Sequence, residues 1–80
     1  MRLPRDVSGE ELAKLLKSFG YTVTRQTGSH LRLTTAEHGE HHITIPKHSP
    51  LRIGTLSSLL ADVAEHFGTT RADLAETLFR

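Results

Sequence analysis

The sequence predicts an α+β fold in which a three-stranded antiparallel sheet carries helices on one face. Apolar residues repeat at helical spacing near the start of the chain, alternate with polar residues in three short central segments, and return to helical spacing towards the end. Strands joined by short turns pair as antiparallel neighbours, and such sheets commonly bury one face and expose the other. The 80 residues leave room for one domain with a modest core, which we expect to span residues 1–80.

The first predicted helix begins after Ser8. Glu11 stands three residues later, and this capping-box pattern satisfies free backbone amides at a helix start. Gly20 is placed to end the helix in a left-handed conformation. Between them the apolar stripe at helical spacing consists of Leu12, Leu15, Leu16 and Phe19.

Two strands are predicted next. Tyr21 and Val23 alternate with threonines, and the enrichment in β-branched residues is typical of a half-buried strand. The turn Thr27-Gly28-Ser29 then breaks the pattern, and a second strand runs from about residue 30 to residue 35. Leu31 and Leu33 should face the core, so the residues between them should face the other way.

A third strand follows a hairpin loop at residues 36–40. Ile43 and Ile45 should face the core, and Pro46 ends the strand. The opposite side of the second and third strands should then form an open face that is cationic and titratable. It would carry His30, Arg32, Thr34, His42 and Thr44.

Two helices complete the pattern. The first opens at Gly54-Thr55-Leu56, ends at Gly68, and has the apolar stripe Leu56, Leu59, Leu60, Val63 and Phe67. The second is short, begins near Thr70 with Asp73 three residues later as a cap, and offers Leu74 and Leu78 to the core. The region around Gly68 also fits a helix-turn-helix, but its second helix would be acidic, so we favour plain helix packing over DNA recognition.

Charge is distributed unevenly along the chain, although its net value is only +1. Residues 14 to 52 hold six Lys or Arg against two Glu, a balance of +4, and five of the six histidines. Residues 1 to 13 sum to −1 and residues 53 to 80 to −2, so we expect nucleic acid to meet the middle of the chain. The absence of cysteine, of a signal peptide and of a membrane-spanning segment predicts a complete cytoplasmic protein without membrane contact.

His30 is the candidate for chemistry on the open face. Histidine is the side chain that titrates nearest neutrality, and a placed histidine can move a proton during phosphodiester cleavage. Gly28 would let the backbone approach a phosphate closely, and successive amides of the turn would form an anion-binding nest. From the pattern alone, an ordinary exposed strand residue after an ordinary tight turn is the simpler interpretation.

A metal site is disfavoured even though histidines cluster around the hairpin. His41 and His42 should point to opposite faces of one strand, and no cysteine is present to join His38 as a ligand. We therefore expect no metal and no other cofactor.

The motifs occur in an order that is informative as a whole. Arg25-Gln26-Thr27-Gly28-Ser29-His30 is followed by a β-hairpin, by Ile45-Pro46-Lys47-His48 and by Gly54-Thr55-Leu56 at a helix start. With the helix end at residues 15–21 and the closing region at residues 68–78, the pattern covers residues 8–79. It resembles the HicA family of toxin-antitoxin systems, whose members are mRNA interferases.

The resemblance implies a fold like a double-stranded RNA-binding domain and an activity that cleaves mRNA and halts translation. It makes His30 the catalytic residue and a HicB-type antitoxin the protein partner that covers the face carrying His30, with DNA contacted only through that antitoxin. We expect RNA contacts from Arg25, Gly28, Ser29, Arg32, Lys47 and His48, with His48 also the candidate second proton-transfer group.

Two other functions stay open on sequence grounds. The same fold would permit a module that grips double-stranded RNA by shape without cutting it, and replacing His30 would then leave binding almost intact. A DNA-binding regulator would instead use the last two helices, and removing residues 69–80 would abolish its specific binding.

Overall fold

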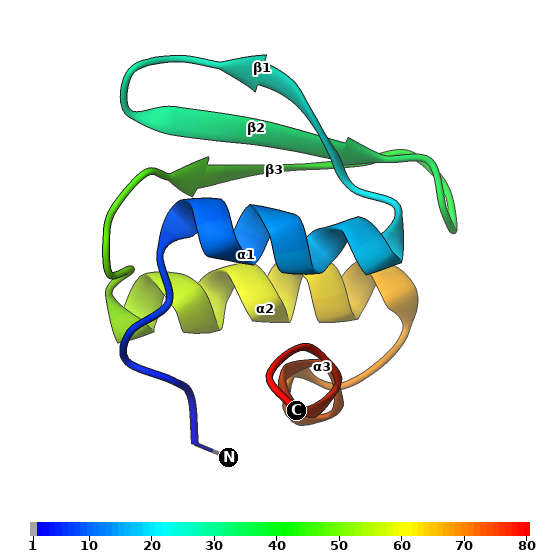
Figure 1. Ribbon diagram of the computed structural model, residues 1–80. Coiled ribbons are helices and arrows are strands. Elements are labelled where there is room, and N and C mark those ends of the chain that lie inside the picture. The colour runs from blue at the N-terminus through cyan, green and yellow to red at the C-terminus, as the bar shows by residue number, and fades with distance from the viewer. Residues whose placement is uncertain (1) are drawn as a thin grey trace.

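A computed structural model describes residues 2–80 and confirms the predicted α+β class. The elements are α1 (Gly9–Leu15), the 3-10 helix η1 (Leu16–Phe19), β1 (Thr22–Gln26), β2 (His30–Thr35), β3 (His41–Pro46), α2 (Ile53–Phe67) and α3 (Arg71–Leu78). The strands form one antiparallel sheet in the order β1-β2-β3. All helices lie on one side of the sheet, as in double-stranded RNA-binding domains, and the other side is open (Figure 1).

The local signals for helix ends are confirmed. Ser8 and Glu11 form a reciprocal capping box, and the Thr70 hydroxyl accepts a hydrogen bond from the Asp73 amide. Gly20 adopts the left-handed conformation with φ of 81°. Two boundaries differ: the first helix tightens into the 3-10 helix η1 over its last turn, and α2 begins at Ile53, one residue before the predicted start.

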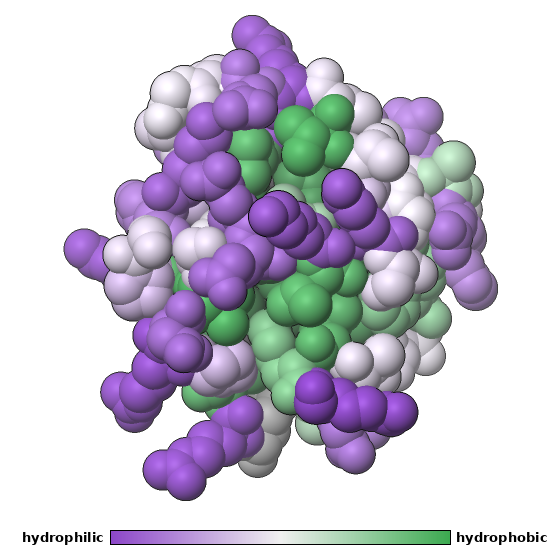
Figure 2. Space-filling view, viewed as in Figure 1, coloured by the Kyte–Doolittle hydropathy of each residue, from purple (hydrophilic) through white to green (hydrophobic). Residues whose placement is uncertain are grey.

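The core lies between the sheet and the helices. Leu31, Leu33, Ile43 and Ile45 enter it from the sheet, as the alternation predicted. The helices contribute Leu12, Leu16, Leu56, Leu60, Val63, Leu74 and Leu78. The burial of Leu74 and Leu78 confirms that the last helix packs on the body of the protein, and polar and charged side chains cover most of the surface around apolar patches (Figure 2).

The prediction of a half-buried first strand is wrong. All five residues of β1 are exposed, and Val23 is 45% exposed although its cross-strand partner Leu33 is in the core. The reason is the position of α1, which packs over β2 and β3 and leaves β1 as an uncovered edge. Only Tyr21, directly before the strand, is fully buried.

The start of α1 fixes the loop that follows β3. The Gly9 amide donates to the His48 carbonyl at 2.9 Å, and the Leu51 amide donates to the Val7 carbonyl at 2.7 Å. Gly9 is needed here because an added Cβ would collide with the carbonyl of Pro46. Within residues 2–80, no helix combines the length and apolar character that crossing a membrane requires.

Candidate functional site

The open face of the sheet carries the side chains that the alternation predicted. His30, Arg32, His42 and Thr44 are exposed, and Thr34 is half-buried. In the register of the sheet, Arg32 pairs with Thr44 and Thr34 pairs with His42. His30 is the first residue of β2 and lies opposite Pro46.

Arg25 reaches this face because β1 contains a β-bulge. Val23 pairs with Leu33 and Arg25 with Arg32, so two residues of β1 advance for one of β2, and Thr24 is the extra one. Unbroken alternation from Val23 would have turned Arg25 towards the helices. The bulge is therefore what places two guanidinium groups opposite each other on the open face.

The Arg25–Arg32 pair favours an anionic ligand. Like charges directly opposite on neighbouring strands destabilise a sheet. In the part of the chain that the structure describes, neither arginine forms an ion pair that would relieve the repulsion. A phosphate between the two side chains would satisfy both through charge-assisted hydrogen bonds.

The turn before His30 is held by Thr27. Its Oγ1 accepts hydrogen bonds from the amides of Ser29 at 3.3 Å and His30 at 3.0 Å. These amides do not form the open anion nest that the motif suggested, because they are directed to the Thr27 hydroxyl. Gly28 has no positive φ, and an added Cβ would meet nothing within 4 Å, so packing within the protein does not require glycine at this position.

The ring of His30 has one partner. Its Nδ1 lies 2.8 Å from the Ser29 hydroxyl oxygen, whereas its Nε2 makes no hydrogen bond within residues 2–80. The residue is exposed on the open face, so Nε2 is accessible to a ligand.

The predicted Lys47 and His48 lie beside this turn. The Lys47 amide donates to the Ser29 carbonyl at 2.8 Å, which ties the loop after β3 to the turn after β1. Lys47 is half-buried and His48 is exposed. The structure thus brings Gly28, Ser29, His30, Lys47 and His48 together at one end of the sheet, with Arg25 and Arg32 further along the open face.

A second titratable group, which the sequence analysis missed, lies at the other end of the sheet. His41 Nδ1 is 2.6 Å from the Tyr21 hydroxyl, and His41 Nε2 is 3.1 Å from Asp62 Oδ1. The ring stacks on His66 with centroids 4.4 Å apart, and His66 Nε2 donates to the Glu37 carbonyl at 2.8 Å. The spacing of Asp62 and His66 on one helix face was the available signal.

The hydrogen bonds of His41 determine which of its ring nitrogens carries the proton. The Asp62 carboxylate accepts a hydrogen bond from Nε2–H of His41, so in the neutral ring Nδ1 carries the lone pair and accepts a hydrogen bond from the Tyr21 hydroxyl. Burial, with the nearby negative charge of Asp62 as a smaller cause, raises the pKa of Tyr21 to about 12. Both causes disfavour the phenolate, so Tyr21 stays a neutral donor.

The histidines of the hairpin are used in separate contacts. His42 bonds Thr34 Oγ1 through Nδ1 and Glu40 through Nε2, while His38 lies against the ring of Phe67. Among residues 2–80, no three His, Cys, Asp or Glu side chains are grouped in a way that would hold a metal ion.

Fold and site together define a small α+β domain of the double-stranded RNA-binding type that displays histidine and arginine on its open sheet face. A family model for the HicA toxin of bacterial toxin-antitoxin systems matches residues 9–64. The chain belongs to the HicA toxin family, and it is therefore a toxin whose system includes an antitoxin as its partner. No curated protein matches the chain. Nor does any solved structure match it.

Proposed function

We propose that this toxin is an endoribonuclease that cleaves mRNA and thereby inhibits translation, with His30 as its catalytic histidine. The observation that carries the proposal is the accessible Nε2 of His30, on a face where Arg25 and Arg32 stand opposite each other without an acidic partner. Each of the chain's other histidines in the sheet has both ring nitrogens engaged.

The reaction follows from the position of the free nitrogen. When Nδ1–H of His30 donates to the Ser29 oxygen, Nε2 keeps its lone pair and can take the proton of a ribose 2′-hydroxyl. The 2′-oxygen then attacks the adjacent phosphorus, and the bond from phosphorus to the 5′-oxygen breaks. A proton delivered to that 5′-oxygen completes the step, and His48, exposed in the neighbouring loop, is the candidate donor.

Cationic side chains supply the remaining stabilisation. Arg25, Arg32 and Lys47 would neutralise phosphates and the charge that develops on phosphorus, so the proposed step needs no metal ion. The open space around Gly28 would let the RNA backbone pass close to the turn.

The antitoxin in this proposal is a HicB-type protein that covers the open face and blocks access to His30. DNA would be contacted only through that antitoxin. The toxin domain would span residues 1–80 and act in the cytoplasm, where mRNA is translated.

The test is cleavage of a long mRNA by purified protein in the presence of a chelator. His30→Ala should lower the cleavage rate about 10²- to 10⁴-fold, the usual contribution of a positioned acid or base. His42→Ala is the matched control, because it removes a histidine from the same face whose ring nitrogens are both engaged, and it should stay close to the parent. Circular dichroism checks that both variants are folded.

Two results would overturn the assignment. Equal cleavage by the parent and His30→Ala would remove His30 from the reaction. A parent protein that binds double-stranded RNA without cutting any RNA would instead be a non-catalytic RNA-binding module.

A further inference from the structure

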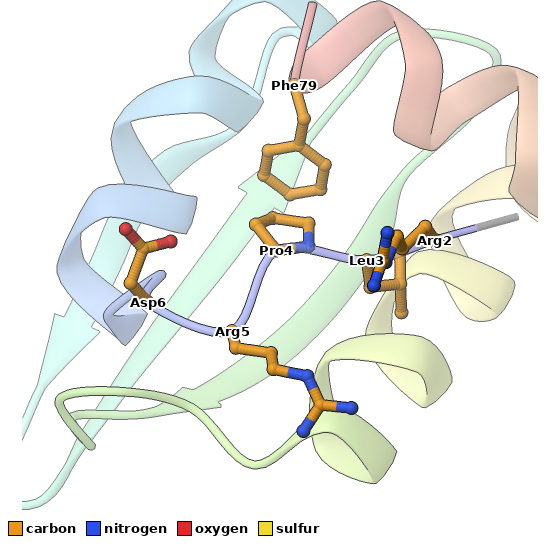
Figure 3. A pocket seen from close by; sticks show the side chains of 6 residues that line it. All are labelled: Arg2, Leu3, Pro4, Arg5, Asp6 and Phe79. Atoms are coloured by element: carbon orange, nitrogen blue, oxygen red, sulfur yellow. The ribbon is translucent and has the colours of Figure 1, made fainter.

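A second basic site lies on the helical side of the molecule. Arg2, Leu3, Arg5, Ile53, Ser57 and Arg71 line a hollow of about 350 Å³ where the N-terminal segment passes the first turns of α2 and α3. Figure 3 shows the adjoining hollow, in which the Arg5 side chain extends towards the start of α2 and Phe79 lies over Pro4. None of the three arginines belongs to the open face of the sheet.

Among the described residues, no carboxylate lines this hollow, and Asp6, which lines the adjoining hollow with Arg2 and Arg5, forms no ion pair with either arginine. The hollow gathers three of the chain's seven arginines, although the net charge of the chain is only +1. In the described part of the chain no arginine forms an ion pair, and Arg71 Nη1 donates only to the Ser57 hydroxyl at 2.7 Å. Three guanidinium groups around one hollow repel each other unless an anion lies between them.

The lining also includes an apolar surface. Ile53 is 37% exposed, which is unusual among the large apolar residues here, and Leu3 lies beside it in the same hollow. Guanidinium forks suit the paired oxygens of a phosphate, and an apolar surface suits the face of an unpaired base. The combination matches a nucleotide of single-stranded RNA.

The hollow lies at the same end of the molecule as His30. The loop after β3 is bonded to the turn that carries Ser29, and it leads through Lys47, His48 and Arg52 to the first residue of α2, which lines the hollow (Figure 1). The molecule measures 31 × 30 × 18 Å. At about 3.4 Å per stacked nucleotide, roughly nine nucleotides would span its longest dimension.

We propose that Arg2, Arg5 and Arg71 form a second RNA-binding site that holds the backbone of single-stranded RNA beyond the nucleotides bound at His30. The proposal rests on the proposed function, because that function makes RNA the substrate. All three arginines lie outside the residues matched by the family model, so membership of the family does not account for them.

The first test measures RNA binding to protein that carries His30→Ala, so that cleavage does not interfere. Fluorescence anisotropy would compare a 4-nucleotide and a 16-nucleotide RNA over a range of salt concentrations. Arg5→Gln with Arg71→Gln should weaken binding of the long RNA about tenfold and reduce its salt slope by about 1.4, from about 0.7 per lost phosphate contact on a single strand. Binding of the short RNA should change less than twofold.

Lys17→Gln is the matched control, since it removes an exposed positive charge that lies outside the hollow and outside the proposed catalytic face. The double variant removes two positive charges and the control removes one. If the binding free energy for the long RNA falls by no more than twice the fall seen in the control, the effect is one of net charge and the proposal is wrong.

A second measurement does not depend on binding at His30. In ¹⁵N-resolved NMR spectra, the side-chain Nε–H signals of Arg5 and Arg71 and the Ile53 amide should shift with the 16-nucleotide RNA and with inorganic phosphate. No shift with RNA overturns the proposal, and a shift with a poly-glutamate peptide alone would identify an acidic protein segment as the occupant instead. Cleavage that depends on His30 together with unmoved Arg5 and Arg71 signals would leave the proposed function standing and remove only this site.

Discussion

The two ends of the sheet hold histidines in opposite ways. The turn end is formed by Gly28, Ser29 and His30 with Lys47 and His48, and the hairpin end is formed by Tyr21, His41, Asp62 and His66 with the β2–β3 loop. At the turn end, His30 has one hydrogen bond to a neighbouring hydroxyl. At the hairpin end, His41 has a partner on each ring nitrogen and a second ring stacked on its face.

The difference separates histidines that are free to react from histidines that hold the fold. A half-buried ring whose two nitrogens are both hydrogen-bonded stabilises the folded state and has no lone pair available for a substrate. An exposed ring with one engaged nitrogen is oriented but still accessible. Changes at the hairpin end should therefore alter stability, and changes at the turn end should alter cleavage.

His41→Ala should cause the largest loss of stability among the variants considered. It leaves the buried Tyr21 hydroxyl without its acceptor and removes the stacking on His66, which we expect to cost about 2–3 kcal/mol of unfolding free energy. For a domain of this size that corresponds to a fall in Tm of about 8–24 °C. Calorimetry beside His30→Ala checks it, because the exposed His30 should change the free energy of unfolding by less than about 0.5 kcal/mol. Equal losses in the two variants would contradict the division.

Tyr21→Phe tests the single hydrogen bond between Tyr21 and His41 at the hairpin end. Removing the hydroxyl should cost about 1 kcal/mol at neutral pH, since the variant loses one hydrogen bond and leaves His41 Nδ1 unpaired. Urea unfolding of the parent and the variant measures this difference.

The same variant should respond differently to alkali. The folded pKa of Tyr21 is raised from 10.0 to about 12, so the stability that its neutral form contributes is complete below pH 10 and is lost as the pH rises towards 12. The advantage of the parent over Tyr21→Phe should shrink across this interval. Tyrosinate absorbance follows the titration directly, because Tyr21 is the only tyrosine, and an ordinary titration near pH 10 would contradict the raised pKa.

Local and periodic patterns in the sequence were sufficient to predict most of the fold. The helix caps at Ser8 and Thr70 could be predicted because they depend on short-range hydrogen bonds. The residues of β2 and β3 that face the core could be predicted because they follow from simple alternation. The placement of His30 on the open face followed from the same alternation.

Features that depend on tertiary contacts could not be predicted in the same way. Alternation from Val23 turns Arg25 inward, and only the bulge at Thr24 reverses this, although no sequence rule locates that bulge. The exposure of Val23 follows from where α1 packs, not from its own strand. The acidic chain ends hid the hollow with Arg5 and Arg71, because a sum of charge along the chain does not show which side chains converge.

Ser29→Ala should have the smallest effect and is the finest test of the turn end. The sequence motif made Ser29 an RNA contact, whereas the structure places its hydroxyl 2.8 Å from His30 Nδ1. If the hydroxyl orients the ring and favours one tautomer, its removal should lower kcat about three- to tenfold while KM stays nearly constant, because only the fraction of correctly placed rings falls. Ser29→Thr, which keeps a hydroxyl, should recover much of the rate. Single-turnover and steady-state cleavage of a short oligonucleotide would separate the two roles, and a raised KM with unchanged kcat would mean that Ser29 binds RNA and does not position His30.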